Sequence, residues 1–265
     1  SNNDGNNING PSLIKVPKWI KSPLGKYYLY FSHHNGKYIR MAYSNKIIGP
    51  YTIYEKGVLN IKNSPGKDHI ASPDVHVDSK NKIITMYYHT CFNEGQYTLE
   101  SFSNDGIFFK SHNIILGSYY FRVFKFKNQL YSIAKGVKNY GEVYKKVNNE
   151  WKIIYKKLIK NIRHTAILVE DNIIYLFYSL IGELQESIYC CVLDIDNFMV
   201  TNNYKLIKPS LEYEGFNFPK EKSKIGMEKK FVNQVRDPGI FINKNDKYLL
   251  YSVSGEKGIA IAKFI

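Results

Sequence analysis

The feature that most constrains the fold is a pair of short strands that recurs five times along the chain. In each pair, turn residues such as Gly, Pro, Asn and Asp separate a first strand from an aromatic, apolar second strand. First strands are predicted at 12–16, 74–78, 122–126, 165–169 and 239–242, and second strands at 26–34, 83–90, 129–136, 173–180 and 247–255. A third strand follows each pair, at 38–44, 96–103, 142–147, 188–195 and 258–264.

The stretch SNDGIFFK at 103–110 predicts a tight Asp-Gly hairpin that leads into a fourth strand. Repeats of roughly 45 to 75 residues with four strands each are typical of β-propellers. The sequence therefore predicts an all-β, five-bladed β-propeller with four-stranded antiparallel blades around a central channel. A two-sheet sandwich is the alternative, although sandwiches lack such an in-register repeat.

We expect one propeller domain over residues 10–265, preceded by a polar N-terminal segment at 1–9. The longest gap in the repeat predicts a loop at about 205–233, between the fourth and fifth blades. This loop is rich in Pro, Gly, Ser and Lys, and long loops in compact folds are often functional.

Basic residues outnumber acidic ones by 37 to 23, and the formal net charge is +14. The lysines are scattered without a long basic run, so the net charge indicates solubility and non-specific association and does not indicate a specific partner. We therefore expect no nucleic-acid partner. A basic propeller that binds nucleic acid or protein stays the third-ranked reading, and steeply salt-dependent DNA binding would support it.

Three cysteines, Cys91, Cys190 and Cys191, form no CxxC motif and therefore predict neither a disulfide framework nor a zinc site. This pattern suits a reducing compartment, and we expect a cytoplasmic protein. Whether a leader peptide was removed before Ser1 is a question that the sequence leaves open. No apolar run is long enough to span a membrane, so no membrane partner is expected.

Only four of the basic residues are arginine, and three of them, Arg122, Arg163 and Arg236, stand at the starts of consecutive first strands. First strands line a propeller channel, so these starts converge on one mouth. Because the planar guanidinium binds a carboxylate or phosphate bidentately, we expect the three arginines to bind substrate. Alternatively, each ties neighbouring blades together through carbonyls and carboxylates. Arg40 lies on an outer strand and is interpreted as structural.

Acidic residues fall at the same end of the blades. Asp74 and Asp237 belong to first strands, while Glu183, Glu186 and Glu256 follow second strands. Glycoside hydrolysis needs two carboxyl groups that flank the scissile bond, one of them protonated. These five residues are the candidate catalytic acids, and a solvated turn or a salt bridge is the alternative role for each.

Histidines and aromatic residues complete the predicted mouth. His34 and His89 end second strands, and His164 starts a first strand. His69 precedes the first strand of the second blade, and these four histidines are candidate substrate-binding residues. No HExxH or similar spacing is present, and no metal site is assigned. Aromatic side chains near strand ends are candidates for a sugar-stacking platform or for ordinary packing: Tyr119, Tyr120, Phe121, Tyr213, Phe216 and Phe218.

Several motifs resemble the five-bladed propeller glycosidases of glycoside hydrolase family 43 and its relatives in families 32, 68 and 117. They are GPSLIKVP at 10–17 with KYYLYFS at 26–32, HIASPDVHVD at 69–78, and RDPGIF at 236–241 with KYLLYS at 247–252. The resemblance implies three channel acids: a base or nucleophile, a second aspartate and a glutamate that acts as the acid. It also implies that the channel can hold a calcium ion; no other cofactor is expected.

The chain departs from that pattern at several positions. Gly10-Pro11 stands where the family places Asp-Pro in the first blade, and Asp237 occupies an Asp-Pro in the last blade. Asp74 follows a stretch that resembles the family's Ala-Pro-Asp, whereas Arg163-His164 replaces the expected Glu-Gly-Pro. The resemblance therefore implies a divergent glycosidase with a rearranged acid set, acting on a small glycoside that can carry a carboxylate or sulfate. The alternative is a non-catalytic propeller that binds carbohydrate or another anionic small molecule.

Overall fold

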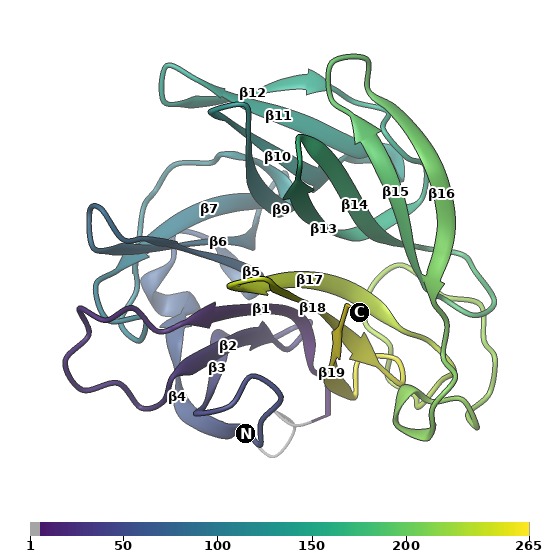
Figure 1. Ribbon diagram of the computed structural model, residues 1–265, viewed down its shortest axis with the longest axis horizontal. Coiled ribbons are helices and arrows are strands. Elements are labelled where there is room, and N and C mark those ends of the chain that lie inside the picture. Colours follow the sequence, from purple (N-terminus) through teal and green to yellow (C-terminus); the bar gives the residue numbers. More distant parts are fainter. Residues whose placement is uncertain (1–5, 265) are drawn as a thin grey trace.

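The computed structural model describes residues 6–264, which form five consecutive antiparallel units (Figure 1). The first unit contains β1 (Asn9–Lys15), β2 (Tyr27–Ser32), β3 (Tyr38–Ser44) and β4 (Thr52–Asn60). The second contains β5 (Lys67–Asp78), β6 (Ile83–Phe92), β7 (Gly95–Ser103) and β8 (Lys110–Ser111). The third contains β9 (Gly117–Phe126), β10 (Gln129–Lys135), β11 (Gly141–Val147) and β12 (Glu150–Tyr155).

The fourth unit contains β13 (Ile162–Glu170), β14 (Ile173–Leu180), β15 (Ile188–Asp194) and β16 (Met199–Ile207). The fifth contains only β17 (Arg236–Asn243), β18 (Asp246–Val253) and β19 (Gly258–Lys263). Three short 3-10 helices lie in the connections: η1 (Ile61–Asn63), η2 (Val137–Asn139) and η3 (Glu212–Glu214). A short β7–β9 pairing joins the second and third units into one eight-stranded sheet.

The units close into a ring, which confirms the prediction of an all-β propeller and excludes a sandwich. Each unit's first strand contacts the first strand of the next, from β1 through β5, β9, β13 and β17 and back to β1. In Figure 1 these first strands lie near the centre of the view, whereas β12 and β16 lie at its edge. A central channel therefore runs between the first strands.

The aromatic composition reflects how the units pack. Five hydrophobic clusters each join two neighbouring units, and large side chains are needed because facing sheets lie about 10 Å apart. In the strand YYLYFS (β2) every residue is buried, because both faces of this strand meet a neighbouring unit. Burying such side chains stabilises the folded state by roughly 25 cal/mol per Å² of apolar surface, and this burial is the main contribution to the stability of the ring.

A backbone irregularity near the start of each first strand shapes the channel. The register with the second strand shifts at this point in all five units, as in a β-bulge. Four residues at these bulges have left-handed φ values: Gly10 at 60°, Ser72 at 55°, Tyr120 at 61° and Asp237 at 54°. With His164, which occupies the corresponding place in β13, we call these five positions the bulge residues.

The structure corrects several predicted strand boundaries. The first strands begin earlier than expected, since pairing continues past the bulge; β5 starts at Lys67, not at Asp74. The fourth strand expected from 103–110 is only the two-residue β8, because the Asp105 carboxylate accepts hydrogen bonds from the backbone N–H groups of Ile107 and Phe108 and extends the turn. In the fifth blade no fourth strand is present among residues 6–264.

The segments outside the blades only partly match their predicted places. Of the polar segment 1–9, residues 1–5 lie outside the described residues, and Asn9 already belongs to β1. The connection from β16 to β17 contains η3 and otherwise no strand or helix. All three cysteines are free thiols. No helix within residues 6–264 is long and apolar enough to cross a membrane.

Candidate functional site

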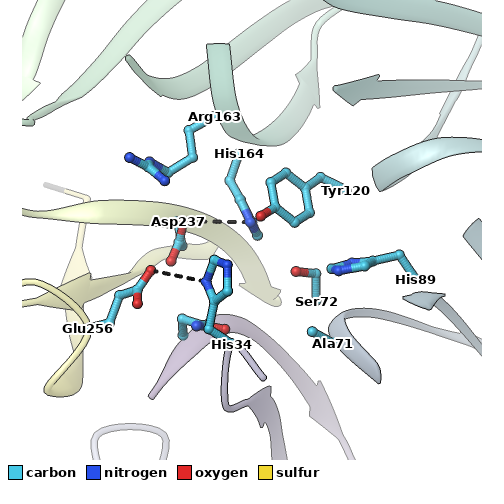
Figure 2. A pocket seen from close by; sticks show the side chains of 10 residues that line it. His34, Ala71, Ser72, His89, Tyr120, Arg163, His164, Asp237 and Glu256 are labelled. Atoms are coloured by element: carbon cyan, nitrogen blue, oxygen red, sulfur yellow. Dashed lines mark ion pairs between the residues drawn. The ribbon is translucent and has the colours of Figure 1, made fainter. Parts of the chain in front are cut away.

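A small buried cavity lies where the bulges meet, and Figure 2 shows the side chains around it. We call it the mouth cavity; it is lined by Asn9, His34, Ala71, Ser72, His89, Tyr120, Arg163, His164, Asp237 and Glu256. These residues come from all five blades, mainly from the bulges and from the ends of second strands. The cavity volume is about 10 Å³, about the room of one water molecule, so a ligand larger than water must move apart the side chains that line it.

Asp237 has a free carboxyl oxygen in this cavity. The side chain is 1% exposed, and Oδ2 accepts a hydrogen bond from Ser252 Oγ at 3.3 Å. Its Oδ1 has no hydrogen-bond partner among residues 6–264 and lies 3.7 Å from His164 Nε2. Burial, and then the negative charge of Glu256, raise the pKa of Asp237 to about 7. A proton therefore resides on this carboxyl group up to neutral pH.

Glu256 is the second carboxyl group of the cavity, and it is held ionised. Its Oε1 lies 3.3 Å from Arg236 Nη1 and 3.7 Å from His34 Nδ1. Its Oε2 accepts hydrogen bonds from Asn7 Nδ2 at 2.5 Å and from the backbone N–H of Glu228 at 3.2 Å. Burial opposes ionisation, but His34 and the arginine charges outweigh it and lower the pKa of Glu256 to about 2.

Two of the sequence-predicted arginines belong to a buried ionic chain that links the fourth and fifth blades. Arg163 Nε donates to Glu186 Oε1 at 2.7 Å, and Arg236 Nη2 lies 3.2 Å from Glu186 Oε2. Arg236 then reaches Glu256 through Nη1. Burial opposes the charge on Glu186, but the two arginines hold the pKa of its carboxyl below the usual range. Glu186 thus serves as the bridge between the arginines and does not line the cavity.

Two of the histidines that line the cavity, His89 and His164, are neutral bases. Burial lowers the pKa values of His89 and His164 well below their usual range. The Tyr120 ring lies between them, with its centroid 3.7 Å from that of His164 and 5.1 Å from that of His89. His69 lies behind His89, Nε2 to Nε2 at 3.3 Å, and does not line the cavity, contrary to its predicted place at the mouth. Burial lowers the pKa of His69 to about 4.

Arg122 and Asp74 lie deeper in the channel, which corrects their predicted place at the mouth. Arg122 donates from Nη1 to the Pro73 carbonyl at 2.6 Å and from Nε to the Thr165 carbonyl at 3.1 Å. It thereby spans the second and fourth blades between the mouth cavity and a second cavity that contains Asp74. Asp74 accepts from His76 Nε2 and from the Val123 N–H, each at 2.8 Å, so it is not paired with Asp237.

Glu183 also falls outside the mouth cavity. Its Oε1 accepts a hydrogen bond from the Tyr189 hydroxyl and lies 3.9 Å from Lys205 Nζ. Among the predicted catalytic acids, the structure therefore brings only Asp237 and Glu256 into one cavity. Both arise from the fifth blade, one from the bulge in β17 and one from the turn after β18.

Sequence reasoning missed several residues at the mouth. Asn9 and Ser72 line the cavity, and Asn7 and Glu228 contact Glu256. Asn9 stands two residues before Pro11, and Ser72 stands directly before Pro73, each at the start of a first strand. These positions could have identified both as residues of the mouth. Asn7 and Glu228 come from segments without repeat signals. Of the predicted aromatic platform only Tyr120 lines the cavity; Tyr213 and Phe218 border a separate groove beside β19, and Phe121 packs in an interblade core.

The histidines and acids do not assemble into a metal site within the described part of the chain. No three His, Cys, Asp or Glu side chains among residues 6–264 are grouped so that they could hold a metal ion. The calcium ion implied by the family resemblance stays a prediction.

Comparisons with solved structures agree with the propeller fold. A glycosyl hydrolase from Bacteroides ovatus matches with a TM-score of 0.74 at 12% identity, over 98% of this chain and 84% of that one. A family GH43 β-xylosidase/α-arabinofuranosidase from a compost microbial metagenome matches with a TM-score of 0.69 at 14% identity, over 98% and 91%. At such identities the likeness concerns the fold, as the resemblance to propeller glycosidases predicted.

Comparisons of sequence give a nearer relative. No protein-family model matches the chain. The uncharacterized protein R118 of Acanthamoeba polyphaga mimivirus is 30% identical, over 97% of this chain and 83% of its own length. The chain therefore belongs to the family of this mimivirus protein, and it has the fold of the propeller glycoside hydrolases.

Proposed function

We propose that the protein hydrolyses a small glycoside at the mouth cavity, by acid–base chemistry. The observation that supports this most is the pair of Asp237 and Glu256. Two carboxyl groups line one buried cavity, and their surroundings raise the pKa of one to about 7 and lower the other to about 2. A pair whose pKa values are driven apart is the usual arrangement for a carboxylic acid and a carboxylate that act together.

In this proposal Asp237 is the general acid. Its Oδ1 is free of protein hydrogen bonds within residues 6–264 and faces the cavity, so it can donate a proton to the leaving oxygen of the glycoside. Glu256 supplies a fixed negative charge for the positive charge that develops on the sugar ring. His34 lines the cavity beside Glu256 and is placed to take a proton from the attacking water (Figure 2).

The test uses the Asp237→Asn and Glu256→Gln variants with a panel of aryl furanosides, pyranosides and uronides. Both changes are nearly isosteric, but Glu256→Gln also removes a buried partner of Arg236, so circular dichroism first confirms that each variant is folded. We expect hydrolysis to fall at least about 100-fold in each, the lower range of what general acid–base catalysis contributes. Glu183→Gln, outside the cavity, serves as the matched control and is expected to retain activity. If wild-type protein cleaves nothing in the panel, or if Asp237→Asn remains active, the proposal is wrong.

Binding without turnover is the second candidate function. It is favoured by the saturation of Glu256, whose two oxygens already meet Arg236, Asn7 and the Glu228 N–H, and by Gly10 in the first bulge, where a side chain could have supplied another acid. Calorimetric binding of monosaccharides to wild-type protein, with no product formed over hours, would support this candidate over hydrolysis.

A further inference from the structure

Lys135 is exceptional among the lysines of this chain. Within residues 6–264 it is the one buried lysine, with 3% of its surface exposed. It ends β10 and pairs across the sheet with Tyr119 of β9. His34 and His89, which line the mouth cavity, belong to the corresponding ends of second strands in the first two blades. The repeat therefore places Lys135 on the mouth side of the channel, where it does not line the mouth cavity itself but lies next to Tyr120, which does.

The Lys135 ammonium has no carboxylate partner. Within the described residues, its Nζ makes no ion pair and no hydrogen bond, and it lies over two aromatic rings. Nζ lies 5.6 Å from the Tyr119 ring centroid and 6.0 Å from that of Tyr120, which is itself a wall of the mouth cavity. Lysines are almost never fully buried without a partner, because an ion taken out of water loses its hydration.

Most of the other buried charges around the mouth are paired, and buried Glu142 accepts hydrogen bonds from Ser118 Oγ at 2.6 Å and from the Tyr144 hydroxyl at 2.7 Å. In the ionic chain, Arg163 and Arg236 offset Glu186 and Glu256. Arg122 and Asp74 face each other at 3.8 Å deeper in the channel. Asp237 is protonated up to about neutral pH. Among the four buried cations around the mouth, Arg122, Arg163, Arg236 and Lys135, Lys135 is the one that forms no ion pair within residues 6–264.

We propose that Lys135 is a substrate-binding residue that recognises a carboxylate on the sugar, so that the preferred ligand is a uronic acid or its glycoside. This inference rests on the proposed function and names its substrate class. A ligand carboxylate beside Tyr120 would supply the counter-charge that the protein does not provide. A lysine suits this role because its ammonium is a compact point charge on a flexible stem, which can turn towards an anion.

The direct test is calorimetric binding of D-glucuronate and D-galacturonate, with glucose and galactose as neutral counterparts. Wild-type protein should bind at least one uronate about 10- to 100-fold more tightly than its neutral counterpart, the usual range for a hydrogen bond to a charged group. Lys135→Met should lose this preference and keep the affinity for the neutral sugar. Lys135→Arg, which keeps the charge, should retain part of the preference.

Lys145→Met is the matched control, because Lys145 lies on the adjacent strand β11 with its Nζ 5.7 Å from the Tyr131 ring centroid, but is only half-buried and away from the mouth. It should bind uronates like wild type. The inference is overturned if wild-type protein binds no uronate, if it binds uronate and neutral sugar equally, or if Lys135→Met keeps the preference. Should Lys135→Met fail to fold, Lys135→Gln replaces it under the same criteria.

Hydrolysis assays separate the failure of this inference from failure of the proposed function. Lys135-dependent uronate binding without cleavage of any glycoside would contradict hydrolysis and leave the inference standing. Cleavage of neutral glycosides at equal rates by wild-type protein and Lys135→Met, with no uronide preference, would contradict the inference and leave hydrolysis standing.

Discussion

Asp237 Oδ1 lies 3.7 Å from His164 Nε2, and both side chains are buried at the mouth of the channel. In an ordinary surface pair of this kind the aspartate would be negative and the histidine at least partly positive. Here burial reverses both preferences: it raises the pKa of Asp237 to about 7 and lowers that of His164 well below its usual range. The pair is therefore neutral at pH 6, with the proton on Asp237.

The first prediction concerns the pH dependence of hydrolysis. If Asp237 must be protonated to act as the acid, kcat/KM should fall as the pH rises through about 7. The measurement is a pH profile from 5 to 9 with the best aryl glycoside of the panel, after confirming that the protein stays folded throughout. A rate that rises above pH 8 would contradict Asp237 as the proton donor.

The second prediction concerns stability. Because the folded-state pKa of Asp237 is raised, its contribution to the free energy of unfolding is fully present below about pH 4 and is lost as the pH rises through 7. Asp237→Asn should therefore be more stable than wild type at pH 8, by on the order of 2 kcal/mol, with a much smaller difference at pH 4. Urea unfolding at the two pH values gives this comparison. An equal difference between the two proteins at both pH values would contradict the assigned pKa.

The third prediction concerns the ionic bridge. Glu186→Gln leaves Arg163 and Arg236 buried without their shared carboxylate, and removing one partner of a buried ion pair costs about 3–5 kcal/mol. Chemical denaturation measures the change. Glu183→Gln is the control, since Glu183 is partly exposed and lies 3.9 Å from Lys205; its cost should stay below about 1 kcal/mol. Similar stability of the two variants would show that Glu186 is not a bridge.

The fourth prediction separates the two roles considered for Arg122. As a brace between the Pro73 and Thr165 carbonyls, it should not tolerate lysine, which keeps the charge but lacks the planar fork. Arg122→Lys is expected to destabilise the fold by about 2 kcal/mol, within the range for buried carbonyls left unpaired. Sugar affinity, measured well below the melting temperature, should stay unchanged. Loss of affinity at full stability would instead indicate that Arg122 binds substrate.

Local signals were sufficient to predict the blades. Turn residues bound each strand, and the aromatic second strands differ clearly from the turns around them, so the repeat and the propeller follow from the sequence. Depth along the channel was not predictable. Asp74 and Asp237 both stand near the start of a first strand, yet Asp237 is the bulge residue of its strand and lies at the mouth, whereas Asp74 follows the bulge residue Ser72 by two positions and lies in the second cavity.

Contacts between distant segments were equally hidden. The neutralisation of Arg163 and Arg236 depends on where Glu186 folds back, which no spacing indicates. The scarcity of arginine was informative in another way: Arg40, Arg122, Arg163 and Arg236 are all buried. The sequence does not distinguish Lys135 from the many other lysines, because its burial follows only from the pairing of β10 with β9.

The bulges have a consequence for how such a cavity can change over evolutionary time. Each bulge directs one residue towards the centre by means of the backbone alone, whether that residue is Gly10, Ser72, Tyr120 or Asp237. Gly10 is more restricted, since its φ is 60° and a Cβ atom there would lie 3.3 Å from Ser72 Cα and 3.7 Å from His164 Cε1, so a side chain fits only if its neighbours shift. At the other four bulge residues, single substitutions can change the chemistry at the centre while the interblade cores, and hence the fold, stay as they are. Because Tyr120 and Asp237 both contact His164, a change at one of these three positions also alters the surroundings of the others.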